Sequence, residues 1–143
     1  MELIKAEHLK TKFEVEGSFY NIEIGSKVFE CRNYAQVYRI DSKNNQWYDA
    51  IFVLANPGLC TPKQSSYEIP HLSIEESSVN YTLAKTDNTQ YQIMRFMQLK
   101  NWNKVLLINL SDMRAGNLNE FRGKLNEAKK AGFESHSIFS FKS

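Results

Sequence analysis

The chain has 143 residues, which is enough for one domain with a sizeable hydrophobic core. Its composition, 42% hydrophobic and 13% aromatic, is that of a folded globular protein rather than a disordered one. The formal net charge of +2 neither demands nor excludes a nucleic-acid partner. The two cysteines lack metal-binding spacing, and no apolar run approaches the ~20 residues that span a membrane. We therefore expect one reduced, cytoplasmic domain over residues 1–143, with no metal, no cofactor and no membrane partner.

The first part of the chain, residues 12–40, predicts antiparallel β structure. Short runs of aromatic and β-branched residues are separated by Gly17, by Gly25 with Ser26, and by Asn33. A polar turn over residues 41–45 then leads into an apolar run at residues 49–55. This run has the length and the flanking turn residues of a buried strand.

The second part predicts two helices and a further strand. Residues 60–85 show no clear period, so we expect a loop there, with a short helical turn near residues 74–78. Apolar residues recur at three- and four-residue steps over residues 89–101, with Asp87, Asn88 or Thr89 available as the N-cap. Residues 104–110 predict a strand covered on both faces, and residues 117–131 a second helix. The tail, residues 132–143, has no assignment.

The predicted fold class is α/β, with an antiparallel β section at the amino terminus joined to a parallel βαβα core. The strand, helix, strand, helix order over residues 49–131 implies two parallel strands joined by a right-handed crossover. The arrangement is three-layer-like, and it is incomplete if a further αβ unit is missing.

Candidate ligand-binding residues follow from this topology. The carboxyl ends of parallel strands and the amino end of the helix between them lie at the same edge of a sheet. Helix N–H groups and an arginine fork at that edge favour an anionic ligand with a planar polar group, such as a nucleotide. The edge would gather residues from three segments: Asn56, Pro57 and Gly58; Asp87 and Thr89 within 86–89; and Asp112 and Arg114 within 111–114.

Each of these side chains also has a local structural explanation. Asn56 suits a cap on its own turn, and Asp87 or Thr89 suits the N-cap of the helix. Asp112 and Arg114 suit a pair with each other, an interaction that contributes little when exposed. From the sequence alone, a ligand-binding role and a local structural role both stay open for these residues.

Three segments, IFVLANPG at 51–58, TDNTQYQIMRFM at 86–97 and KVLLINLSDMRAGN at 104–117, carry a family resemblance. They are similar to the "LNPS" strand and turn, the "DPTIRR" helix start and the "VVNLFAYRAT" strand and loop of the bacterial and phage family called domain of unknown function 1643. Gly58 stands where that family has Ser, and Asn88 where it has Pro. The family continues into another αβ unit with a His-Pro motif, so the resemblance implies a shortened member or an amino-terminal portion.

A more distant similarity concerns the same turn. Asn56-Pro57-Gly58 resembles the "INPG" turn of mismatch-specific uracil-DNA glycosylases, whose first motif positions a water for attack on the glycosidic carbon. The resemblance implies that Asn56 is the catalytic, water-positioning residue. Together with the strand-end topology, it leads us to expect Arg114 as a phosphate or base-edge contact and Asp87 and Asp112 as supporting groups. We therefore expect a glycosylase-like domain that binds nucleic acid or nucleotide, with its activity open. The alternatives are a non-catalytic interaction module, such as a homodimer that hides a sheet edge, and a small-molecule nucleotide enzyme.

Overall fold

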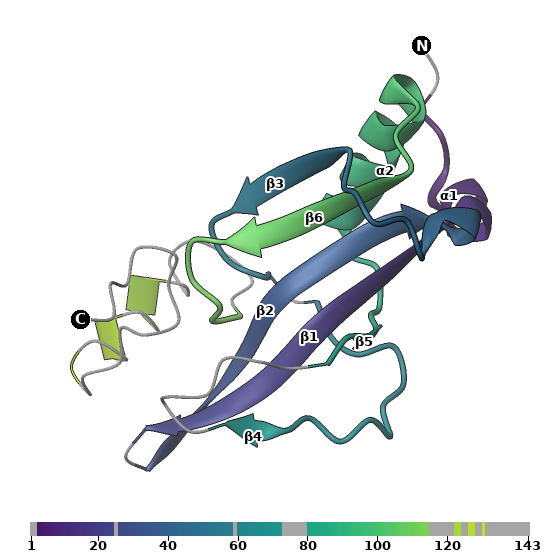
Figure 1. Ribbon diagram of the computed structural model, residues 1–143. Helices are drawn as coiled ribbons and strands as arrows, with labels where there is room; N and C mark the ends of the chain where they lie inside the picture. The colour runs from purple at the N-terminus through teal and green to yellow at the C-terminus, as the bar shows by residue number, and fades with distance from the viewer. Residues whose placement is uncertain are drawn as a thin grey trace.

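The computed structural model describes residues 3–24, 26–58, 60–72 and 80–114, together with residues 122, 123, 126, 127 and 130. Its described part contains a six-stranded mixed sheet with the strand order β3-β6-β2-β1-β4, and β5 pairs with β1 (Figure 1). The sheet contains an antiparallel amino-terminal hairpin and a parallel strand pair. The predicted α/β class and its two sections are confirmed.

The spine of the sheet is one long antiparallel hairpin formed by β1 (Phe13–Ile24) and β2 (Lys27–Arg39). The separate short runs expected over residues 12–40 are thus joined into two strands. Gly17 pairs with Ala35, whereas Phe19 pairs with Arg32, so β2 has one residue more than β1 between these pairs. This irregularity is a β-bulge within the hairpin.

The parallel unit consists of β3 (Ala50–Leu54), α2 (Asn88–Lys100) and β6 (Lys104–Asn109). β3 and β6 pair in parallel, as predicted. Helix α2 begins one residue earlier than expected, with Asp87 as N-cap and a capping box in which Asp87 and Gln90 exchange hydrogen bonds. It ends at Lys100 and is followed by the C-cap Asn101, whose left-handed backbone, with φ of 56°, is a common helix terminator.

The prediction that residues 49–55 form a buried strand is wrong in one respect. β3 lies at the end of the sheet, with β6 as its neighbour, and β6 lies between β3 and β2. Phe52 and Leu54 pack against the core, but Ile51 and Val53 are 59% and 56% exposed. Consecutive strand residues point to opposite faces, so the exposed pair lies on the face away from α2.

Several shorter elements complete the described chain. Helix α1 (Ala6–Lys12) was not expected, and η1 (Ile40–Ser42) begins at the last residue of the expected β section and extends into the expected turn. The short strands β4 (His71–Leu72) and β5 (Thr82–Leu83) lie in the segment expected to be a loop. The helical turn expected near residues 74–78 and the tail 132–143 lie outside the described residues. Within the expected helix 117–131, residues 122, 123, 126, 127 and 130 have helical backbone. No helix in the described ranges is long and apolar enough to cross a membrane.

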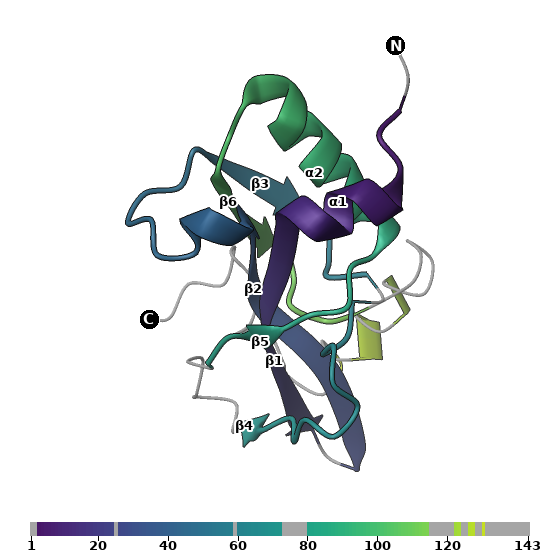
Figure 2. The same cartoon turned by 90° about the vertical axis from the view of Figure 1, so that its right-hand side faces the viewer.

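Two hydrophobic clusters lie on opposite faces of the hairpin. Helices α1 and α2 lie next to one another over one face, where Leu9, Met94 and Met97 pack against the sheet (Figure 2). The second cluster is smaller and consists of Tyr20, Ile22, Phe29, Cys31 and Met113. Phe19 belongs to the first cluster and Tyr20 to the second, as expected for adjacent strand residues. The sheet therefore has a buried surface on both sides of the hairpin.

Candidate functional site

The turn after β3 and the amino end of α2 come together, as the topology predicts. The Asn56 side-chain Oδ1 accepts a hydrogen bond from the Gly58 N–H at 2.7 Å, which makes this segment an Asx turn. Gly58 has a φ of 66°, a left-handed conformation that glycine adopts without strain. A Cβ built on Gly58 would lie 3.7 Å from Oδ2 of Asp87, so the turn and the helix cap are adjacent.

The polar side chains around this turn also contact one another. Asp87 caps α2 by accepting the Gln90 N–H at 2.9 Å. The buried Gln90 side chain donates from Nε2 to the Cys60 sulfur at 3.2 Å, just after the turn. Pro57 is buried, whereas Thr89 is exposed in the first turn of the helix. The local explanations for Asn56 and Asp87 are therefore correct, and a ligand role for either residue stays a prediction.

The contacts of Asp112 and Arg114 lie in a different place, against the β1–β2 hairpin. The chain leaving β6 pairs with β2, because the Arg32 N–H donates to the Asp112 carbonyl and the Arg114 N–H donates to the Glu30 carbonyl. The Asp112 carboxylate accepts from the Tyr20 hydroxyl at 2.6 Å. Arg114 Nη1 lies 3.0 Å from Glu30 Oε2. The structure thus places these two residues beside the hairpin, and their expected role in ligand binding stays a prediction.

The Tyr20 hydroxyl is held in its protonated form. Burial raises its pKa above the ordinary tyrosine value, and the neighbouring Cys31 and Asp112 raise it further. The neutral hydroxyl is the donor that the Asp112 carboxylate requires. Tyr20 and Asp112 therefore form a buried polar link between β1 and the segment that follows β6.

Arg32 in β2 is the most unusual polar side chain of the described chain, and the sequence reasoning missed it. It is fully buried, with 0% of its surface exposed. Its Nη2 lies 3.5 Å from Oδ1 of Asn109, at the outer limit of a hydrogen bond. Its Nε and Nη1 find no hydrogen-bond partner within the described ranges. Leaving a buried charge without compensation costs on the order of 3–5 kcal/mol.

Arg32 and Asn109 lie at the sheet edge that the topology singled out. Arg32 pairs with Phe19, a residue of the cluster beneath α2, so its side chain is on the α2 face of the sheet. Asn109 is the last residue of β6 and pairs with Leu54 of β3, two positions before Asn56. The guanidinium is therefore on the α2 side of the sheet, near the carboxyl ends of the two parallel strands.

Asn109 has a fixed orientation because its amide group also supports the β-bulge. Its Nδ2 donates to the Arg32 carbonyl at 3.1 Å and to the Asn33 carbonyl at 2.9 Å. Both donor hydrogens are used in this way, so the Oδ1 atom must face the guanidinium as an acceptor. One neutral acceptor at 3.5 Å does not satisfy the cation, and most of the donor capacity of the guanidinium is unused among the described residues.

A basic hollow, which we name the lysine hollow, adjoins the amino end of helix α2. It has a volume of about 250 Å³, and its polar lining includes Lys10, Lys63, Lys85, Thr86 and Glu14. The ring of Tyr91 also lines it, with Lys10 Nζ 5.9 Å from the ring centroid. Lys85 and Thr86 immediately precede the Asp87 cap. Among the described lining residues, three lysines against one glutamate favour a negatively charged ligand here.

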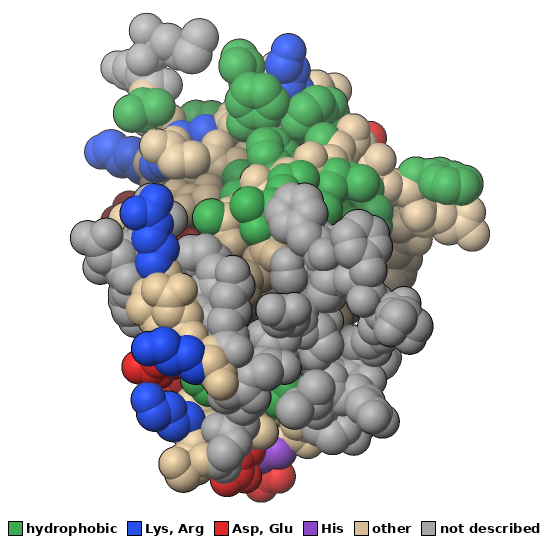
Figure 3. All heavy atoms as spheres, turned by 90° about the vertical axis from the view of Figure 1, so that its left-hand side faces the viewer, with side chains coloured by type: hydrophobic (Ala, Val, Ile, Leu, Met, Phe, Trp, Pro, Cys, Tyr) green, Lys and Arg blue, Asp and Glu red, His purple; other side chains and the backbone are tan. Residues whose placement is uncertain are grey.

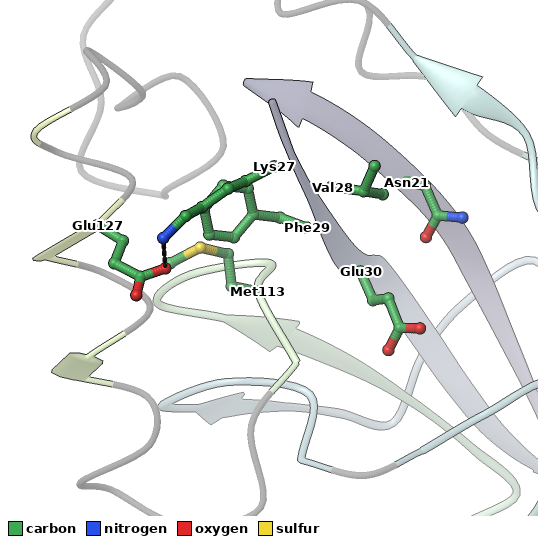
Figure 4. A pocket seen from close by; sticks show the side chains of 7 residues that line it. All are labelled: Asn21, Lys27, Val28, Phe29, Glu30, Met113 and Glu127. Carbon is green, nitrogen blue, oxygen red and sulfur yellow. Dashed lines mark ion pairs between the residues drawn. The ribbon is translucent and has the colours of Figure 1, made fainter. Parts of the chain in front are cut away.

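A larger cavity, of about 410 Å³, lies toward the tip of the β1–β2 hairpin (Figure 4). An ion pair between Lys27 and Glu127, at 3.2 Å, spans one side, and both side chains are largely exposed. Such a pair contributes little to stability. Among the described residues of the lining, two are acidic and one is basic, so this part of the cavity lacks the positive character of the lysine hollow. The lining residues are Asn21, Lys27, Val28, Phe29, Glu30, Met113 and Glu127.

A further cluster of polar side chains, on β1, on β2 and directly after η1, is satisfied by contacts among its own members. The buried Glu16 accepts from the Tyr38 hydroxyl at 2.6 Å and lies 3.7 Å from Lys43 Nζ. Burial raises the Tyr38 pKa above its ordinary value, and the hydrogen bond to Glu16 raises it further. These groups satisfy one another, so we assign them a structural role.

Comparison with known proteins identifies no relative: no protein-family model, no curated protein and no solved structure matches the chain. The resemblances to the family called domain of unknown function 1643 and to the glycosylases therefore stay predictions. The geometry of the described residues defines a mixed α/β domain with a buried, undercompensated arginine at the carboxyl end of its parallel strands.

Proposed function

We propose that this chain binds a nucleotide or a segment of nucleic acid, and that Arg32 with Asn109 holds the anionic group of that ligand. The observation that carries this proposal is the complete burial of Arg32, two of whose nitrogens lack partners among the described residues. A phosphate would supply both the missing acceptors and the missing countercharge, because a guanidinium fork binds its oxygens in pairs.

The lysine hollow supports a ligand that carries more than one charge. Lys10, Lys63 and Lys85 line it next to the start of α2. The Tyr91 ring in the same lining offers an aromatic face on which a base could stack. Phosphate groups together with a planar base fit this combination better than a simple carboxylate does.

A more specific form of this proposal is that the protein catalyses base excision, and this form depends on Asn56. The Asn56 Oδ1 accepts the Gly58 N–H at 2.7 Å and keeps a second lone pair that could orient a water. The adjacent Asp87 cap and Asn56 turn would bring that water to the same end of the sheet as Arg32. This activity requires a nucleic-acid substrate, so binding is tested first.

The decisive binding experiment uses Arg32→Met. We expect inorganic phosphate and nucleoside phosphates, at constant ionic strength, to raise the Tm of the wild type in a concentration-dependent way. At 100 times Kd the stabilisation is about 2.7 kcal/mol. Arg32→Met should abolish this shift. Without ligand it should be as stable as the wild type or more stable, because it replaces an undercompensated charge by an apolar side chain of similar length.

Arg95→Met is the matched control. Arg95 lies on α2, where its guanidinium donates to the Ile4 carbonyl and to the Gln92 side chain. This variant loses the same charge and should keep the phosphate-dependent shift. The proposal is wrong if phosphate compounds leave the wild-type Tm unchanged and Arg32→Met is strongly destabilised, because Arg32 would then have a structural counterpart.

Nucleic-acid binding is measured separately with fluorescent single- and double-stranded DNA and RNA at low and moderate salt. Lys63→Glu and Lys85→Glu should weaken binding and reduce the salt slope by about one for each lost phosphate contact. Binding of nucleotides without binding of polymers would restrict the ligand to a free nucleotide. If polymers bind, cleavage of a uracil-containing duplex by wild type and by Asn56→Ala tests base excision.

A further inference from the structure

The edge of the sheet formed by β3, with which no described strand other than β6 pairs, is a second surface with functional potential. β3 is the terminal strand, and its pairing within the described chain is to β6 alone. Its sequence, AIFVL, contains neither a charged residue nor a proline. Natural edge strands are usually protected from pairing with other chains by a lysine, a proline, a bulge or a covering segment. β3 itself has no such residue.

Apolar side chains lie on both sides of this edge. On the face away from α2, Ile51 and Val53 are exposed. On the α2 face, Phe52 packs edge-on against Phe96 and Trp102, at ring-centroid distances of 6.2 and 6.4 Å. Figure 3 views the molecule from the side on which β3 lies and shows hydrophobic side chains gathered there.

Helix α2 extends the apolar surface. Phe96 is 41% exposed and Leu99, three residues further along the helix, is 63% exposed. Residues three apart lie on the same helix face, so Leu99 continues the surface that Phe96 begins. We name the set formed by Ile51, Phe52, Val53, Phe96 and Leu99 the β3 edge patch.

We propose that the β3 edge patch joins two copies of this chain through antiparallel pairing of their β3 strands across a twofold axis. The strand is suited to pairing with itself because its exposed residues are symmetric about Phe52. With Phe52 on the axis, Ile51 of one copy lies opposite Val53 of the other, and the reverse holds at the same time. Four β-branched side chains then cover one another on one face.

The charge distribution favours this occupant over a charged partner. The charged residue nearest to the start of the strand, Asp49, is turned toward β6, where its Oδ2 accepts the N–H groups of Asn103 at 2.6 Å and Lys104 at 3.2 Å. No charge within the strand itself would be brought next to its own copy. A neutral, apolar and symmetric edge is complementary to itself, and edge pairing would continue the sheet across the axis.

The first test compares oligomeric states by sedimentation velocity over a range of protein concentrations. The wild type should form dimers, and Ile51→Lys with Val53→Lys should remain monomeric. The double variant places like charges opposite each other in the proposed register, so its dimer dissociation constant should rise about tenfold or more. Both positions are exposed, so the variant should retain the circular dichroism spectrum and the Tm of a folded monomer.

Val28→Lys is the matched control, because Val28 is a β-branched strand residue that is 53% exposed and lies near the hairpin tip. It should dimerise like the wild type. A wild type that stays monomeric at every concentration overturns the proposal. Equal loss of the dimer in Val28→Lys overturns it as well, because dimerisation would then not depend on β3.

The second test fixes the register by oxidative cross-linking. Because position 51 faces position 53 of the other copy, the double variant Ile51→Cys with Val53→Cys should form a covalent dimer upon mild oxidation. Each single-cysteine variant should cross-link much less, because its two copies of the same position lie on a diagonal at about 7–8 Å. The native Cys31 and Cys60 are buried and should contribute little background.

The cross-linking test distinguishes the proposed antiparallel register from other pairings of the two β3 strands. Efficient cross-linking of a single variant, and not of the double variant, contradicts the antiparallel register centred on Phe52. The β3 edge patch contains none of the residues that line the lysine hollow, and it does not include Arg32. Failure of phosphate binding and failure of dimerisation are therefore distinguishable results.

Discussion

The side chain of Arg32 occupies space that exists because residue 17 is glycine. A Cβ built on Gly17 would lie 3.1 Å from Cδ of Arg32 and 2.9 Å from Cε2 of Phe19. Both distances are too short for ordinary packing, and the two neighbours are themselves fully buried. Close packing against Phe19 and Arg32, rather than a turn, therefore explains the glycine at position 17.

Gly17→Ala should lower the free energy of unfolding by about 1–3 kcal/mol, because the added methyl group overpacks a filled interior. It should also weaken phosphate binding, because the Arg32 stem must shift. Urea denaturation and the phosphate-dependent Tm shift measure the two effects. Gly123→Ala is the control: apart from its chain neighbours and its own helix backbone, no atom of the described residues lies within 4 Å of the added Cβ, and Ala favours the helical backbone observed there. Equal effects at both positions would contradict the packing argument.

Asn56 should have a measurable structural role that is separable from any role in catalysis. Asn56→Ala removes the acceptor of the Gly58 N–H and should cost about 0.5–1.5 kcal/mol in urea denaturation. Asn56→Asp keeps an acceptor oxygen and should stay close to wild-type stability. If base excision is observed, loss of activity in Asn56→Asp with unchanged stability would assign the amide group to the reaction. Full stability of Asn56→Ala would show that the turn hydrogen bond contributes nothing.

Asp87 should stabilise helix α2 through its cap. Asp87→Ala is expected to cost about 0.5–2 kcal/mol, whereas Asp87→Asn should retain most of the stability because Asn is also a good N-cap. Asp41→Ala provides the control, since Asp41 lies in the short helix η1 and is not an N-cap. Thermal unfolding monitored by circular dichroism compares the three variants. A stable Asp87→Ala would contradict the importance of the capping box.

The stability of the protein should fall at alkaline pH, and Tyr20 should be one of the causes. Its pKa is raised in the folded protein, so the folded form keeps a proton that the unfolded form loses above about pH 10. The stabilisation is fully present below that pH and is lost as the pH rises further. Tyr20→Phe should cost about 1–3 kcal/mol at neutral pH, because Asp112 loses a donor.

Urea denaturation from neutral to alkaline pH tests this linkage. The stability difference between wild type and Tyr20→Phe should shrink as the pH rises, since the variant lacks the titrating hydroxyl. Tyr38 and Tyr81, whose pKa values burial also raises, titrate in both proteins and therefore cancel in the comparison. A constant difference across the pH range would contradict a role for the Tyr20 proton.

The parallel unit was predictable because its signals are local. The apolar residues of α2 recur with the helical period, and the cap residues precede them. The apolar run of β6 is bounded by polar residues. The position of β3 in the sheet was not predictable from the same kind of signal. A five-residue run of apolar side chains has the same sequence pattern whether one of its faces is buried or both are, and here Ile51 and Val53 remain exposed.

Part of the geometry around the candidate site was predictable from the sequence. The topology correctly brought the Asn56 turn next to Asp87, whereas the path of residues 111–114 toward the hairpin depends on long-range pairing with β2. Arg32 was missed because a single arginine in a β-prone run looks like a surface residue. Asn109 offered a usable signal, since a polar residue that directly follows the apolar run of a central strand needs a specific partner when it is buried.

The β-bulge between the pairs Gly17–Ala35 and Phe19–Arg32 limits how the chain can change in length during evolution. On one side of it Ala35 and Val37 face α2, and on the other side Phe29 and Cys31 face the opposite cluster. Deleting one residue at the bulge would turn one of these halves outward, because a one-residue slip exchanges the two faces of a strand. Insertions and deletions in relatives should therefore occur mainly at the hairpin turn, where they do not change which face of the sheet the side chains of either half occupy.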